Sequence, residues 1–231
     1  GYSPNFAAKN LKKQKTELVG LFVHDINGPF YNELIRGIQQ VTILNGYELI
    51  VFCDSGTKKN SSYNFLSERR VDGAIIISST IKDDEIMTLT KNGLPIVVLD
   101  REITGEKLCN VLVDNEHGAS NAVMHLIGQG YRDIAFLSGP QEAYDNRKRF
   151  EGYKKTLKDN GIKFNEKMVI NGSFTENSGY NAVTNYLEIN KKPPEAIFSS
   201  NDEMAIGAIF ALRDKGYNVP KDVAEIGRAH V

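Results

Sequence analysis

The sequence of 231 residues lacks a long hydrophobic run and has only two cysteines. No stretch of ~18 consecutive apolar residues is present, so the sequence predicts no membrane-spanning helix. Its first 16 residues also lack the apolar core of a secretory signal. Two cysteines are too few for a disulfide-built domain, and both Cys53 and Cys109 stand in apolar runs. We therefore expect two buried thiols and a cytoplasmic protein.

The chain also lacks a strong net charge. The formal charge is −1, with 41% hydrophobic and 25% charged residues, which is typical of a globular chain and excludes a disordered or collagen-like one. The length predicts one large domain or two small ones. Residues 1–16 carry four lysines and no acid, whereas the remaining 215 residues hold 24 bases and 29 acids. Such a leader is typical either of an arm that contacts nucleic acid or of a solvated tail.

Motifs of catalysis and of cofactor binding are absent as well. No glycine-rich phosphate loop follows an apolar run, no G-x-S-x-G turn is present, and the four histidines lack metal-ligand spacing. The acidic run from Asp83 to Glu85 is expected to begin a helix, where it favours the helix dipole. The sequence therefore predicts a binding protein, with no catalytic residue, no metal and no cofactor.

What is present from Leu18 onward is an alternation of short apolar runs with amphipathic segments. Residues 30–44, 116–127, 145–160 and 202–215 have helical periodicity and end at or near glycine. This alternation predicts an α/β fold built from βαβ units with parallel sheets. The expected strands are Leu18–Val23, Glu48–Cys53, Gly73–Ile77, Pro95–Leu99, Val111–Val113, Ile134–Leu137, Met168–Ile170 and Ala196–Phe198.

Polar residues follow most of these strands. Parallel sheets bind ligands at the carboxyl ends of their strands, so this edge predicts a cleft for a polar small molecule. Asn27 and Asn201 each precede an expected helix and are predicted to cap it. The polar edge comprises Asp25 to Phe30, Asp54, Ser78, Ser79, Asp100, Arg101, Asp114, Asn115, Gly139, Pro140, Asn201 and Asp202.

A set of short motifs, in this order and spacing, resembles the lactose-repressor (LacI/GalR) family of transcriptional regulators. The resemblance spans residues 2 to about 224. Its motifs are Tyr2-x-Pro4-Asn5-x-x-Ala8-Lys9-x-Leu11, Val19-Gly20-Leu21-Phe22-Val23, Asn27-Gly28-Pro29-Phe30-Tyr31, Arg70-Val71-Asp72-Gly73, Val113-Asp114-Asn115, Gly152-Tyr153 and Asn201-Asp202-Glu203-Met204-Ala205.

The resemblance implies that residues 1–16 are a hinge following a helix-turn-helix headpiece that this chain does not include. The family's hinge enters the minor groove of operator DNA, where a leucine wedges a base step open. The matching residues are Asn5, Ala8, Lys9 and Leu11, although lysine replaces the usual arginine at position 9.

The body resembles a type I periplasmic-binding-protein fold with two Rossmann-like lobes, residues 17–114 and a partial lobe of residues 115–224. Such proteins bind an effector between the lobes, and the pattern here is most similar to that of ribose-type members. Arg147 is the best match to an arginine early in its helix, with Arg149 close by. The implied effector-binding residues are Phe30, Tyr31, Asp100, Arg101, Arg147, Phe174 and Asn201.

The resemblance further implies a homodimeric repressor of sugar-utilisation genes, with a monosaccharide such as ribose as effector. Residues 225–231 depart from the family pattern, and we expect them to be a non-native tail of a C-terminally truncated chain. The alternatives are an extracytoplasmic sugar-binding protein of a transporter, a cytosolic sugar-processing enzyme, and a regulator whose effector is a purine or a phosphoprotein.

Overall fold

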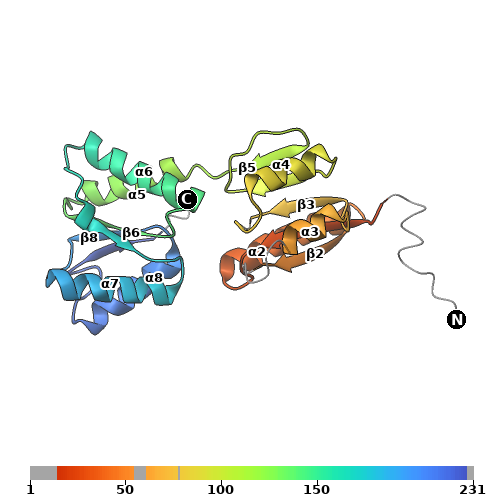
Figure 1. The fold of residues 1–231 in the computed structure, drawn as a ribbon. Coiled ribbons are helices and arrows are strands. Elements are labelled where there is room, and N and C mark those ends of the chain that lie inside the picture. The colour runs from red at the N-terminus through yellow and green to blue at the C-terminus, as the bar shows by residue number, and fades with distance from the viewer. Residues whose placement is uncertain (1–14, 55–60, 78, 228–231) are drawn as a thin grey trace. The chain divides into compact units, whose positions relative to one another are not determined.

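The chain forms two compact units, one up to Leu112 and the other from Val113 (Figure 1). The structure is a computed structural model that describes residues 15–54, 61–77 and 79–227. Each unit is an α/β layer structure with one parallel sheet, as the alternation of apolar and amphipathic segments predicts. The predicted fold class of two parallel-sheet lobes is confirmed.

The first unit is built on a five-stranded sheet in the order β2-β1-β3-β4-β5. All its neighbouring strands are parallel, so every connection between them crosses over the sheet. The strands are β1 (Leu18–Val23), β2 (Glu48–Cys53), β3 (Gly73–Ile76), β4 (Ile96–Leu99) and β5 (Leu108–Val111).

Three helices lie in the crossovers of this unit: α2 (Pro29–Leu44), α3 (Ser61–Ser67) and α4 (Asp83–Lys91). Phe22, Ile76 and Val98 point to one face of the sheet, where Leu66 of α3 and Ile86 of α4 pack against them. These residues alternate with others along each strand, so one sheet face buries a continuous apolar layer.

The second unit has a four-stranded parallel sheet in the order β7-β6-β8-β9. The strand residues are apolar on both faces because helices cover both faces. The strands are β6 (Ile134–Ser138), β7 (Val169–Asn171), β8 (Ala196–Ser199) and β9 (Ala224–Ile226), and a short 3-10 helix at Glu166–Met168 precedes β7.

Four helices complete this unit: α5 (Asn115–Gly128), α6 (Tyr144–Asp159), α7 (Glu176–Asn190) and α8 (Asp202–Asp214). Phe136 and Phe198 belong to a core shared with α5 and α6, whereas Leu137 and Ile197 belong to a second core shared with α7 and α8. The two helix pairs therefore cover opposite faces of the sheet. At one edge of this sheet β6 leads into α6 and β8 leads into α8, so both helices begin at the carboxyl ends of these neighbouring strands.

Three predictions from the sequence are wrong. The strand expected at residues 111–113 lies at Leu108–Val111, because the short strand β4 pairs with residues 108–111. Cys53 and Cys109 are exposed, since each lies on an edge strand of the first sheet. Asn27 does not cap α2, whose first residue is preceded by Gly28 with no side-chain cap.

The Asn27 side chain instead donates to Asp25 Oδ1 at 2.8 Å, and its backbone N–H donates to the same oxygen at 3.0 Å. Hydrogen bonds from Asn27 and from the backbone N–H of Ile26 lower the pKa of Asp25. The loop after β1 is therefore organised around a carboxylate rather than around a helix cap. Asn201 does cap α8 as predicted, accepting from the Met204 N–H at 3.0 Å.

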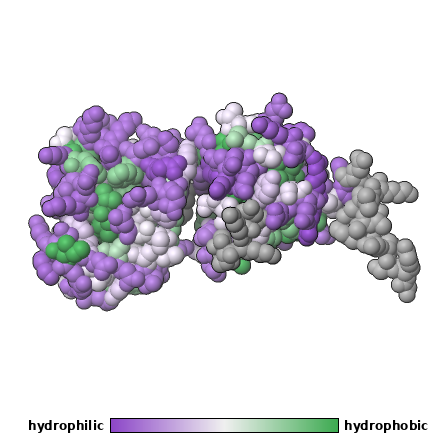
Figure 2. Space-filling model, in the orientation of Figure 1, coloured by the Kyte–Doolittle hydropathy of each residue, from purple (hydrophilic) through white to green (hydrophobic). Residues whose placement is uncertain are grey.

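The visible surface of both units is mainly hydrophilic, with small hydrophobic patches between charged residues (Figure 2). Among the residues that the structure describes, no helix is long and apolar enough to cross a bilayer.

Candidate functional site

The order of the second sheet defines a place where a ligand can bind. The chain leaves β6 through α6 toward β7 on one side, whereas β8 lies on the other side of β6. Loops that follow two such strands diverge and leave a crevice at their carboxyl ends. Six residues at this edge are polar although they are buried: Asn115, Ser138, Asn146, Arg149, Ser199 and Ser200.

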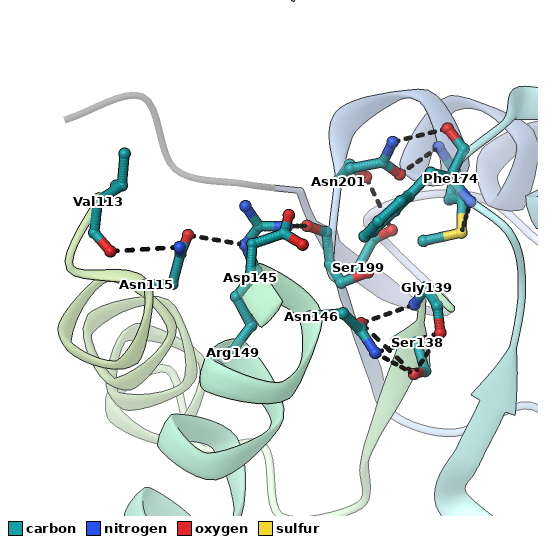
Figure 3. A network of polar contacts seen from close by, with 12 residues as sticks. Val113, Asn115, Ser138, Gly139, Asp145, Asn146, Arg149, Phe174, Ser199 and Asn201 are labelled. Atoms are coloured by element: carbon teal, nitrogen blue, oxygen red, sulfur yellow. Dashed lines mark hydrogen bonds and ion pairs between the residues drawn. The ribbon is translucent and has the colours of Figure 1, made fainter. Parts of the chain in front are cut away.

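Arg149 is the most buried charged side chain at this edge, with 6% of its side chain exposed (Figure 3). Its Nη1 lies 2.8 Å from Asp145 Oδ2 and donates to the Ser200 carbonyl at 2.8 Å. Its Nε donates to Asn115 Oδ1 at 3.1 Å. A buried guanidinium is stable only when it is paired and hydrogen-bonded. These partners therefore fix Arg149 against α5 and the end of β8.

Asn146 holds the turn between β6 and α6. The Gly139 N–H donates to Asn146 Oδ1 at 2.7 Å, and Asn146 Nδ2 donates to Ser138 Oγ at 3.0 Å and to the Gly139 carbonyl at 3.2 Å. The side chain is buried, so these bonds satisfy its amide at both ends. These bonds therefore fix the conformation of the turn after β6, and the Gly172 N–H of the neighbouring loop donates to the Ser138 carbonyl at 2.7 Å.

That neighbouring loop presents Phe174. The residue has φ of 67°, a left-handed conformation that is unfavourable for a phenylalanine. Asn201 Nδ2 donates to its carbonyl at 2.8 Å, and its N–H donates to Met204 Sδ at 3.3 Å. Its ring covers Gly139, where an added Cβ would lie 2.2 Å from a ring carbon. Phe174 is thus held in place from three directions.

Together these groups offer a cation, side-chain amides and one aromatic ring at a single sheet edge (Figure 3). Arginine and asparagine donate to hydroxyl and carbonyl oxygens, and an aromatic face packs on an apolar face of a ligand. This arrangement suits a small molecule that carries several oxygen atoms.

One partly buried acid, Glu225, lies next to this region on β9. Burial and the nearby Asp202 raise the pKa of Glu225 to about 7, and Glu225 Oε1 has no hydrogen-bond partner among the described residues. The charged form of Glu225 is therefore disfavoured in the folded protein.

The structure separates the two arginines near the start of α6. Arg147 is exposed, donates to the Glu142 carbonyl at 2.6 Å and lies over the Tyr144 ring at 5.9 Å. Arg149 lies on the buried face of the helix, one turn before Gly152 and Tyr153. Residues two positions apart point in different directions on a helix, so only Arg149 reaches the carboxyl ends of β6 and β8.

The first unit holds the other four predicted effector contacts after its own strands. Phe30 and Tyr31 begin α2 with their rings edge to face, the centroids 5.2 Å apart. Asp100 follows β4 with φ of 51°, also left-handed. Arg101 donates to the Ile81 carbonyl at 2.8 Å and pairs with Asp83 at the start of α4. The roles of all four as effector contacts stay predictions.

The predicted hinge contacts Asn5, Ala8, Lys9 and Leu11, and the polar-edge residue Ser78, lie outside the described residues. Residues 225–227 are described, and Glu225 and Ile226 belong to β9, which pairs with β8. The expectation that residues 225–231 are non-native stays a prediction.

Comparison with protein families gives one match over residues 16–231, to the family described as periplasmic binding proteins and sugar binding domain of LacI family. The chain is also 35% identical over 231 residues to catabolite control protein A of Priestia megaterium, covering 98% of this chain and 69% of that protein. The chain belongs to the LacI family. It comprises the ligand-binding part of a LacI-type transcriptional regulator.

Solved structures of LacI-type regulators share this fold. A sugar-binding transcriptional regulator from Enterococcus faecalis has 36% sequence identity and a TM-score of 0.80, covering 92% of this chain and 77% of that one. The transcriptional regulator CelR in complex with cellobiose has 28% identity and a TM-score of 0.83, covering 95% and 71%. The relatives found by sequence are transcriptional regulators rather than enzymes, and they include the AscG regulator of Escherichia coli at 34% identity.

Sequence reasoning missed Asp145 and Asn146, and it preferred Arg147 to Arg149. Two signals were present. Asp145 and Arg149 have the i, i+4 spacing of a helical ion pair, and Arg149 shares a helix face with Tyr153. Asn146 carried no sequence signal, because its role depends on how closely the turn after β6 approaches α6.

Proposed function

We propose that this chain binds a monosaccharide as the effector of a cytoplasmic, homodimeric repressor of sugar-utilisation genes. The buried Arg149, fixed by Asp145, Asn115 and the Ser200 carbonyl, is the observation that carries the proposal. A guanidinium held in this way has a fixed orientation, so that a sugar hydroxyl that reaches it binds with little loss of side-chain entropy.

Phe174 and Asn201 complete the polar and apolar sides of the proposed site. A pyranose or furanose ring has a C–H face that packs on an aromatic ring, and its hydroxyls need donors and acceptors at the edge. We assign the arginine role to Arg149 in place of Arg147, and we keep Phe30, Tyr31, Asp100 and Arg101 as effector contacts.

The experiment is calorimetry and thermal unfolding of the 231-residue chain with a panel of pentoses, hexoses, cellobiose and purine bases. A ligand that binds only the folded state at a hundred times its Kd stabilises it by ~2.7 kcal/mol. We expect one monosaccharide, ribose first, to give that shift. Stabilisation by a purine base and by no sugar would overturn the sugar class and leave the family assignment intact.

Operator binding in this proposal uses the hinge residues Asn5, Ala8, Lys9 and Leu11 together with a helix-turn-helix headpiece. Operator binding can be measured with a chimera in which the headpiece of a related PurR protein is joined to the N-terminus of this chain. Leu11→Ala should weaken binding to a specific operator more than binding to unrelated DNA, because a wedge acts only at a deformable base step. Equal losses on both DNAs would contradict the role of Leu11.

A further inference from the structure

A second charged surface of the second unit lies away from the polar network around Arg149. Residues 144–167 hold eight basic and four acidic residues, whereas the rest of the chain holds 20 basic and 25 acidic residues. Positive charge is therefore concentrated in this segment and in residues 1–16, whereas the chain outside these two segments holds 16 basic and 25 acidic residues. Such a concentration indicates an anionic partner unless local ion pairs neutralise it.

Ion pairs neutralise only part of this charge. Asp145 pairs with Arg149 and Glu151 pairs with Lys148, both at 2.8 Å. Lys155 lies 3.7 Å from Glu116, a weak exposed contact. Within the described part of the chain, the remaining lysines of the segment form no ion pair: Lys154, Lys158, Lys163 and Lys167.

These lysines surround a half-exposed aromatic ring. Two adjoining shallow grooves share Lys163 and Phe164, and they extend from the last turns of α6 to Lys167. Lys154 Nζ lies 4.9 Å from the centroid of the Phe164 ring and 5.3 Å from that of Phe150. A cation–π contact holds an ammonium in place without neutralising it. We call this surface, made of Lys154, Lys155, Lys158, Lys163, Lys167 and Phe164, the lysine groove.

The fold alone does not account for the lysine groove. Lys158 lies in the last turn of α6, where a cation stabilises the helix dipole. Lys154 and Lys158 are four residues apart on one exposed face, so their mutual repulsion destabilises the helix. Lys163 and Lys167 lie beyond α6 and do not act on its dipole. A partner with the opposite charge would offset this repulsion.

The partly buried ring of Phe164 discriminates among anionic partners. It packs edge to face on Phe150 and on Tyr153, with centroids 5.8 and 6.3 Å away, and its accessible part lines both grooves. Duplex DNA presents phosphates on its outer surface, whereas its apolar groups lie within the grooves and between stacked bases, away from the phosphates that the lysines would bind. An acidic protein segment with an aromatic or aliphatic side chain satisfies both the lysines and Phe164. Asp159 and Glu166 also line the grooves, so the acidic side chains of the partner must be spaced apart from them.

We propose that the lysine groove binds an acidic, extended protein segment that inserts one apolar side chain against Phe164. The groove thereby gives this regulator a protein partner in addition to its effector and its operator. Charge attraction accelerates the association, and the apolar contact gives it specificity.

The test uses a fluorescent peptide rich in aspartate and glutamate with one central phenylalanine, titrated with the 231-residue chain at low salt. Two variants address the surface: Lys154→Glu with Lys158→Glu, and Phe164→Leu. The matched control is Lys221→Glu, an exposed charge reversal outside the segment. We expect the double reversal to weaken binding at least ~tenfold and the control less than ~twofold. Phe164→Leu should weaken binding of the phenylalanine peptide and leave a peptide with serine at that position unchanged.

Three results would overturn the proposal. The first is equal weakening of peptide binding by the double reversal and by Lys221→Glu, which would show that binding depends on the net charge of the chain and not on the lysine groove. The second is equal binding of the phenylalanine and serine peptides. The third is tighter binding of a single-stranded oligonucleotide of the same charge, which would make the groove a nucleic-acid site, since stacked bases also use aromatic rings among lysines.

Discussion

At the scale of single residues, Arg149 connects three parts of the second unit. It bonds the side chain of Asn115 at the start of α5, Asp145 on its own helix and the carbonyl of Ser200 after β8. Removing one member of a buried ion pair is costly because the other charge remains without a partner. Arg149 is therefore both a structural residue and the proposed effector contact, and an experiment must separate the two roles.

A matched pair of substitutions separates them. Arg149→Lys keeps the charge but loses the planar fork, so we expect at least ~tenfold weaker effector binding and a loss of ~1–3 kcal/mol in the free energy of unfolding. Arg147→Lys, on the exposed face of the same helix, should change both by little, within ~0.5 kcal/mol for unfolding. Calorimetry and urea unfolding measure the two quantities. A larger effect on effector binding at position 147 would return the role to Arg147.

Gly139 offers a test of Phe174. In Gly139→Ala the new Cβ would overlap the Phe174 ring, so the ring must shift from its place. We expect a loss of ~1–3 kcal/mol in the free energy of unfolding and a clear loss of effector affinity. Gly128→Ala, where an added Cβ meets nothing within 4 Å, is the control. Unchanged affinity in Gly139→Ala would remove Phe174 from the proposed site.

At the scale of elements, the strand β9 carries an acid where its neighbours in the sheet are apolar. Glu225 pairs in register with Ile197 of β8, and burial raises its pKa from 4.5 to about 7. The unfolded chain loses this proton near pH 4.5 and the folded chain near pH 7. The free energy of unfolding therefore decreases as the pH rises between these two values.

Glu225→Gln removes this titration. We expect the variant and the parent chain to be similarly stable below pH 4.5, and the variant to be more stable by up to ~3 kcal/mol above pH 7. Urea unfolding at a series of pH values measures the difference. A difference that does not vary with pH would show that Glu225 is ionised or solvated in the folded chain.

The elements themselves were largely predictable from the sequence. Fully buried strands such as β6 correspond to apolar runs in the sequence, and helices such as α8 are marked by a polar cap residue before them and a glycine after them. The edge strand β5 was less predictable, because it is exposed along most of its length and its position follows from pairing with β4. The exposed thiols Cys53 and Cys109 have the same explanation: a residue with apolar neighbours in the sequence is not buried when its strand lies at the edge of the sheet.

At the scale of the whole molecule, each unit has a core of its own. Phe22 lies in the core of the first unit and stacks on Phe52 at 5.4 Å between centroids. Phe136 lies in a core of the second unit and stacks on Tyr153 at 5.3 Å. Both rings are fully buried.

Large-to-small changes should therefore act on one unit at a time. Phe22→Ala is expected to cost the first unit ~3–5 kcal/mol, and Phe136→Ala to cost the second unit a similar amount. Hydrogen exchange of the backbone amides in β1 and in β6 measures the stability of the first and of the second unit separately. Each variant is the control for the other, and equal loss of protection in both units would contradict independent cores.

The candidate site was predictable only in part. The polar edge was visible because strands end at predictable places, and Asn201 was identified from its position before α8. The choice between Arg147 and Arg149 depends on which helix face is buried, and the tight contact of Phe174 with Gly139 depends on two loops distant in sequence. Pairwise packing between distant segments leaves little trace in a single sequence.

Every strand pair in both sheets is parallel, and this has a consequence for how the chain reaches its structure. Leu18 pairs with Glu48, and Ile134 pairs with Ala196, so no pair of strands can form as a local hairpin. Each unit must close long loops before its sheet gains any stability, and such topologies fold slowly. We therefore expect newly synthesised chains to expose their apolar strands for longer than a helical bundle would, which favours aggregation before folding is complete.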